Sequence, residues 1–230
     1  MKIFGIKHHG LGDSLAFSTI PQRFTEEKGL NCYFYEHDIQ NFKNKEIYNL
    51  VWGMNPFIKG ITNIYPDSGG NIGSTKSDEH TVVWHFERLH GLEPKNEIPK
   101  IYYEPKVLEE LKEYTIIDVN SFHYYKKIFE NRHEIKELVM SIAKGKCLFV
   151  GYDRTIGVEE INSALFAQEY DSFKIHSLLH YCDVLNSCKQ FIGANSGCNS
   201  LAAAIGGGAD IIMTEENKGY TFPNNNYHYL

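Results

Sequence analysis

The sequence predicts an α/β protein made of two doubly wound parallel sheets in series. Short apolar segments alternate with segments of helical spacing in both halves of the chain. Each half also contains a strand that turns through small polar residues directly into a helix. Pro94, Pro99 and Pro105 punctuate the stretch between the halves. We therefore expect an N-terminal domain over residues 1–104, a C-terminal domain over residues 105–230, and a cleft between the two.

In the first half, residues 1–6 alternate as a strand, and residues 14–20 carry apolar side chains at helical spacing. Asp13 or Ser14 is expected near the N-cap of that helix, and Pro21 to kink it or begin a second one. A strand at 31–36 completes a strand–helix–strand unit with a right-handed crossover. Short strands at 48–52 and 61–65, a loop at 67–74, and a helix at 80–89 closed by Gly91 follow.

The second half repeats the alternation. Strands are expected at 115–119, 147–151, near 173–175, at 190–193 and at 210–214. Helices are expected at 108–114, within 124–143, near 157–168, at 177–187, and after the 195–197 turn up to Gly206. Strands and helices of this length that alternate along the chain are typical of a mostly parallel sheet. The tail over 215–230 either crosses back to the first domain or hangs free.

The composition and charge of the chain argue against several classes of protein and of binding site. No apolar run approaches the roughly 20 residues that span a bilayer, and the N-terminus begins a strand instead of a signal peptide, so we expect a cytoplasmic protein. The net charge of −6 argues against a nucleic-acid surface. Five cysteines without a C-x-x-C pair indicate reduced, mostly buried thiols. His80, His85 and His90 would lie about 140° apart around a helix, so no metal site is expected there.

The turn at Asn195, Ser196 and Gly197 is the main candidate site. It joins an apolar strand to a small-residue helix, and a helix N-terminus offers unpaired N–H groups and a partial positive charge to an anion. Ser196 adds a hydroxyl, and the end of a parallel strand is where open α/β sheets bind ligands. The alternative is an ordinary capped corner, since Asn and Ser are also favoured as caps.

The glycine turn at Gly10 and Gly12 is the second candidate. Asp13 beside it is placed to accept a proton from a hydroxyl, or else serves as an N-cap. His8 and His9 either contact an anionic or acceptor substrate or are solvated. A third glycine of the dinucleotide fingerprint is missing, which leaves a nicotinamide-dependent oxidoreductase as a weaker interpretation.

Three further residues follow strands of the second half. Ser121 and Lys126 would suit a diphosphate, or else begin a solvated helix. Tyr152 lies in the segment after 147–151 and would line a nucleoside pocket, unless that segment is a plain surface loop.

Two segments carry a family resemblance. Residues 6–15, Ile-Lys-His-His-Gly-Leu-Gly-Asp-Ser-Leu, with Ile20 and Pro21 after them, resemble the opening of the ADP-heptose:lipopolysaccharide heptosyltransferase family. Residues 191–204, Phe-Ile-Gly-Ala-Asn-Ser-Gly-Cys-Asn-Ser-Leu-Ala-Ala-Ala, resemble its donor-site motif, and residues 55–58 and 80–99 fall in the family's order. The resemblance implies two facing Rossmann-like domains, the GT-B arrangement, and inverting, metal-independent sugar transfer without a cofactor.

The resemblance also implies roles. Asp13 corresponds to the proposed base on the acceptor hydroxyl and Lys126 to a phosphate-binding lysine. The residues expected around the donor diphosphate are Gly12, Ser121, Lys126, Asn195, Ser196, Gly197 and Ser200. The substrates implied are a nucleotide-diphospho-sugar, with a heptose-like sugar, and a glycan or lipid-linked acceptor of lipopolysaccharide biosynthesis, with peripheral membrane contact.

The chain departs from the family at two site positions and in length. The family usually has Asp where this chain has Asn195, and commonly His where it has Ser200, and its members are longer. A non-catalytic nucleotide- or sugar-phosphate-binding protein on the same scaffold is therefore the alternative.

Overall fold

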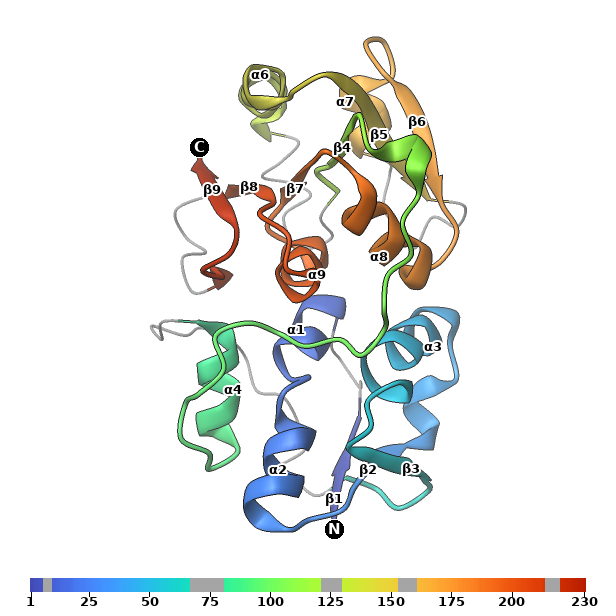
Figure 1. Cartoon of the computed structure of the whole chain (residues 1–230), viewed down its shortest axis with the longest axis vertical. Helices are drawn as coiled ribbons and strands as arrows, with labels where there is room; N and C mark the ends of the chain where they lie inside the picture. Colours follow the sequence, from blue (N-terminus) through green and yellow to red (C-terminus); the bar gives the residue numbers. More distant parts are fainter. Residues whose placement is uncertain (6–9, 67–80, 121–129, 153–160, 214–219) are drawn as a thin grey trace. The chain divides into compact units, whose positions relative to one another are not determined.

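The chain forms two compact units in a computed structural model, which describes residues 1–5, 10–66, 81–120, 130–152, 161–213 and 220–230. The N-terminal unit comprises residues 1–104 and 219–223, and the C-terminal unit comprises residues 105–218 and 224–230. Each contains a parallel β-sheet, and the predicted α/β class is confirmed (Figure 1). The loop expected at 67–74 lies outside the described residues.

The sheet of the N-terminal unit has three parallel strands in the order β1-β2-β3. Its strands are β1 (Lys2–Phe4), β2 (Cys32–Tyr35) and β3 (Ile58–Thr62), and its helices are α1 (Leu11–Ala16), α2 (Ile20–Lys28), the 3₁₀-helix η1 (Glu36–Ile39), α3 (Phe42–Ile47), the π-helix η2 (Tyr48–Gly53) and α4 (Val82–Leu89). Pro21 stands in the first turn of α2, where a missing N–H costs nothing, so it begins a second helix. Gly91 has a φ of 67° and follows α4 closely, as expected.

An aromatic cluster fills the core of this unit. Trp52 stacks on Phe4 at a centroid distance of 5.8 Å, and Phe17 meets Trp52 edge-on at 5.8 Å and Phe86 at 5.7 Å. All four are buried. Trp52 belongs to η2, so the strand expected at 48–52 was wrong: a run buried on successive residues fits a strand and a buried helix equally well.

His90 packs at the edge of the same cluster. Its ring meets Phe17 edge-on at 4.8 Å. Burial lowers the pKa of His90 from 6.5 to about 4, and the charge of Lys2 acts in the same direction. The imidazole is therefore neutral in the folded unit at neutral pH.

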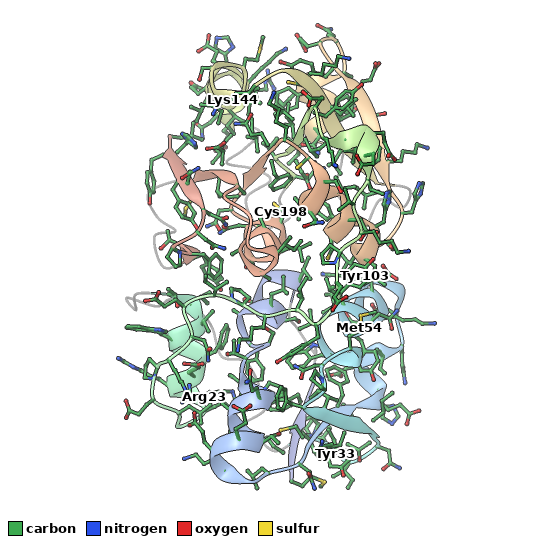
Figure 2. All side chains as sticks on the ribbon, in the orientation of Figure 1. Arg23, Tyr33, Met54, Tyr103, Lys144 and Cys198 are labelled. Carbon is green, nitrogen blue, oxygen red and sulfur yellow. The ribbon has the colours of Figure 1, made fainter. Side chains whose placement is uncertain are left out.

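A buried carboxylate ties α4 to the segment that follows it. Glu87 is fully buried, and its Oε2 accepts hydrogen bonds from the backbone N–H groups of Lys95 (2.6 Å) and Asn96 (3.3 Å). Oε1 accepts from Asn96 Nδ2 at 2.6 Å and from the Thr19 hydroxyl at 3.3 Å. Arg23 of α2, labelled in Figure 2, places Nη1 3.1 Å from Oε2. One side chain thus joins two helices and the 93–96 segment.

The sheet of the C-terminal unit has six parallel strands in the order β6-β5-β4-β7-β8-β9. Its strands are β4 (Tyr114–Asp118), β5 (Lys146–Tyr152), β6 (Asp171–Ile175), β7 (Gln190–Ala194), β8 (Asp210–Met213) and β9 (Asn226–Tyr229), and its helices are the 3₁₀-helix η4 (Glu109–Leu111), α6 (Arg132–Ile142), α7 (Ile161–Phe166), α8 (Leu178–Ser187) and α9 (Gly197–Ile205). The first strand, β4, lies in the middle, so the strand order reverses between β4 and β7. Apolar side chains from β4, β5, β7, α6 and α7 form the core of this unit.

Two expectations for this unit were wrong or incomplete. The helix expected at 108–114 is only the short η4, because Tyr114 already pairs with β5. The tail does not hang free: residues 219–223 belong to the N-terminal unit, as one alternative expected, whereas β9 belongs to the C-terminal unit and pairs with β8 in parallel. Figure 1 shows β9 in red beside β8.

The cysteines are unpaired, and Cys32, Cys182 and Cys198 are buried. Burial raises the pKa of Cys182 and of Cys198 to about 12, so neither is a thiolate at neutral pH. In the part of the chain that the structure describes, none of the helices has both the length and the hydrophobicity to cross a bilayer.

Candidate functional site

The reversal of strand order in the C-terminal unit positions its candidate site. β4 and β7 are parallel neighbours, with Asp118 opposite Gly193 in the register. Their carboxyl ends therefore meet at one edge, where Asn120 follows β4 and Asn195 follows β7. Ligands of open α/β sheets bind at such a reversal, outside the carboxyl ends of the strands.

The turn after β7 is both a capped corner and an open helix N-terminus. Ser196 is the N-cap of α9, and its Oγ accepts from the Cys198 N–H at 3.4 Å. The Asn195 N–H donates to the Ile212 carbonyl of β8 at 3.1 Å, which holds the turn against the sheet. Ser196 and Gly197 stay half-buried. The cap uses the hydroxyl as an acceptor, and Cys198 Sγ lies 3.0 Å from the same oxygen, so the hydroxyl hydrogen can be directed to that sulfur or to an anion.

Asn195 is oriented by a chain of asparagines. Its Oδ1 accepts from Asn199 Nδ2 at 3.0 Å, and Asn199 Oδ1 accepts from Asn225 Nδ2 at 2.9 Å and from the Tyr227 hydroxyl at 3.2 Å. The oxygen of Asn195 therefore points to α9, and its Nδ2 group is the remaining polar group of the side chain. A neutral amide donor suits an anion better than a carboxylate at this position.

Ser200 lies one turn into α9 and is 1% exposed, so in the described structure it presents almost no surface to a ligand. Cys198, labelled on α9 in Figure 2, is buried below the turn with its Sγ 3.0 Å from Ser196 Oγ. Its raised pKa removes it as a nucleophile.

A buried polar cluster that the sequence analysis missed holds the end of β4. Asp118 is 1% exposed and accepts a short hydrogen bond from the Tyr181 hydroxyl. Asn162 donates from Nδ2 to Asp118 Oδ1 at 3.0 Å, and its Oδ1 accepts from the Val119 N–H at 2.8 Å. An aspartate within the apolar run 115–119 was the available signal. This cluster fixes the backbone at the carboxyl end of β4.

The N-terminal unit carries the candidate base. Asp13 lies in the first turn of α1, near the N-cap as expected, but the N-cap itself is Gly10, so the alternative that Asp13 serves as the N-cap was wrong. Gly12 precedes Asp13 in the same turn. The carboxylate is half-buried, and its Oδ1 accepts from the Tyr220 hydroxyl at 3.1 Å. Tyr220 belongs to the 219–223 segment of the same unit.

The remaining candidates are not described at the level of side chains. His8, His9, Ser121 and Lys126 lie outside the described residues. For Tyr152 the structure gives the backbone alone, which ends β5 opposite Ile175 of β6. Within the described ranges, no three His, Cys, Asp or Glu side chains gather as they would around a metal ion.

No protein-family model and no curated protein sequence matches the chain. Solved structures do match. The iron-containing dodecameric glycosyltransferase TibC from enterotoxigenic E. coli H10407 is similar with a TM-score of 0.67 and 16% identity, covering 97% of this chain and 61% of TibC. E. coli heptosyltransferase WaaC with ADP gives 0.54 and 10%, covering 100% of this chain and 93% of WaaC. The family 9 glycosyl transferase from Veillonella parvula DSM 2008 gives 0.53 and 11%, covering 99% and 84%.

The chain thus spans less than two thirds of the length of TibC. At these identities the likeness establishes the fold: an α/β fold of the GT-B heptosyltransferase type, with a parallel sheet in each unit.

Proposed function

We propose that the chain is a glycosyltransferase that moves a heptose-like sugar from a nucleotide-diphospho-sugar to a glycan or lipid-linked acceptor of a bacterial surface polysaccharide. The observation that carries the proposal is the strand–turn–helix at 190–205. Its turn follows β7, beside which the strand order reverses, and it offers amide and hydroxyl donors. The fold adds support, since TibC was also solved in complex with ADP-D-β-D-heptose, at a TM-score of 0.65 and 15% identity.

In the proposed reaction Asp13 takes the proton from the acceptor hydroxyl. The acceptor oxygen bonds to the anomeric carbon from the face opposite the diphosphate, and the bond from that carbon to the diphosphate oxygen breaks with its electron pair. One displacement inverts the anomeric centre. The negative charge that develops on the leaving diphosphate requires donors held in advance. We assign Asn195 Nδ2, the Ser196 hydroxyl and the Gly197 N–H to this role, without a metal ion.

The other assignments complete the proposal. Ser121 and Lys126 add a hydroxyl and an ammonium to the diphosphate site, and Tyr152 contacts the nucleoside. Gly12 lets the diphosphate approach the first turn of α1. His8 and His9 contact the acceptor. Ser200, being buried, would act through the packing of α9.

The test is turnover of a panel of ADP-, UDP-, GDP- and CDP-sugars by the wild type and by Asp13→Asn. Loss of a general base is expected to lower kcat by roughly 10²- to 10⁴-fold. Donor binding, followed by thermal shift, should stay unchanged. Asp171→Asn removes an exposed carboxylate of β6 and is the matched control. Full activity of Asp13→Asn would exclude Asp13 as the base.

A second candidate function is a binding protein for nucleotides or sugar phosphates without turnover. Asn195 favours it, because a neutral amide held by Asn199 can bind phosphate but cannot exchange a proton with a substrate. Stabilisation by one nucleotide sugar with no product would support this function over the transferase.

A further inference from the structure

The candidate base is contacted by a residue from the far end of the chain. The Tyr220 hydroxyl donates to Asp13 Oδ1 at 3.1 Å across a separation of 207 residues. Both residues belong to the N-terminal unit, although residues on both sides of 219–223 belong to the other unit. The N-cap of α1 is Gly10, and Asp13 lies in the first turn of that helix.

The segment that carries Tyr220 is anchored just beyond it. Phe222 is 1% exposed. A phenol two residues before a buried phenylalanine has little freedom to move away. The burial of Phe222 therefore restrains the segment that presents the hydroxyl to Asp13.

We propose that Tyr220 is a positioning residue for Asp13: its hydroxyl selects the carboxylate orientation in which Asp13 meets the acceptor. The proposal rests on the proposed transferase function. A general base must lie within about 2.6–3.2 Å of the group that gives up the proton. An aspartate in the first turn of a short helix has several rotamers, and a hydrogen bond to Oδ1 selects among them. Tyr220 exchanges no proton with the substrate, since the acceptor proton passes to Asp13.

Tyr220→Phe removes the hydroxyl and keeps the ring. Misplacing a catalytic group by about 1 Å costs on the order of 100-fold in rate, so we expect kcat to fall roughly 10- to 100-fold. The KM for the donor should stay within about twofold, because the variant removes no group assigned to the donor. Tyr229→Phe makes the same chemical change on an exposed side chain of β9 and is the matched control.

A double-mutant cycle distinguishes positioning from a structural role. If Tyr220 acts through Asp13, Tyr220→Phe has no further effect on residual transfer in the Asp13→Asn background. Equal losses in both backgrounds, as a folding defect would produce, overturn the proposal. So does a Tyr220→Phe variant within twofold of the wild type. A wild type that turns over no donor overturns the transferase itself, and the two failures are therefore distinguishable.

Discussion

Replacing the buried Glu87 carboxylate is expected to destabilise the N-terminal unit strongly. In Glu87→Ala, Arg23 loses a partner 3.1 Å away, and the Lys95 and Asn96 N–H groups lose their acceptor. Breaking a buried ion pair costs about 3–5 kcal/mol. Arg23 keeps its bonds to Glu27 and to the Glu93 carbonyl, which places the expected loss near the lower end, about 3 kcal/mol.

Glu87→Gln separates charge from shape. The amide can still accept the two backbone N–H bonds at one end, while its NH₂ group must face the Thr19 hydroxyl and the Asn96 amide at the other. A hydrogen bond to a charged group is worth about 1 kcal/mol more than a neutral one, so we expect a loss of about 1–2 kcal/mol.

Urea unfolding followed by tryptophan fluorescence measures the free energy of unfolding of the N-terminal unit. Both tryptophans, Trp52 and Trp84, lie in the N-terminal unit, so their signal follows that unit, whereas far-UV circular dichroism follows both units. Glu93→Ala removes an exposed carboxylate from the same segment and should change the free energy of unfolding by less than about 0.5 kcal/mol. A Glu87→Ala loss below about 1 kcal/mol, or one matched by Glu93→Ala, would refute the reasoning.

Two further predictions concern the cores of the units. Gly193→Ala places a Cβ 2.7 Å from the Phe191 ring and should destabilise the C-terminal unit by about 1–3 kcal/mol, moving the dichroism transition, whereas Gly10→Ala, with open space around it, is the control. Because His90 has a pKa of about 4 when folded and about 6.5 when unfolded, the unfolded state binds more protons between these values, and the free energy of unfolding of the N-terminal unit should fall as pH drops from 6.5 to 4. His90→Gln should flatten that dependence in the fluorescence-detected transitions, and an unchanged slope would contradict the assignment.

Elements with an unambiguous local pattern were predictable. The run 115–119 became β4, and the small-residue segment after Ser196 became α9, because apolar strands and small-residue helices bounded by turn residues have few alternatives. The 48–52 segment was not predictable by periodicity, since Leu50, Val51 and Trp52 are all buried in a π-helix. The strand β9 was not predictable either. Its sequence, Asn-Tyr-His-Tyr, contains no apolar run, and the strand pairs with β8 alone, at the edge of the sheet.

The candidate site shows the same division. The position of the 195–197 turn follows from local sequence, because a strand end and a helix start are local features. The contacts that orient its side chain do not, since Asn225 reaches Asn199 from 26 residues away. The contact of Tyr220 with Asp13 depends on where a tail of polar and aromatic residues ends up in the fold, and nothing in the two local sequences encodes it.

The return of residues 219–223 to the N-terminal unit bears on how the chain can be divided. A cut after residue 104 leaves the first fragment without Tyr220 and Phe222 and leaves the second carrying them outside their own unit. Phe222, which is buried in the intact chain, then lies on the longer fragment without the unit to which it belongs. We therefore expect fragment 1–104 to need residues 219–223 of fragment 105–230 for its native packing.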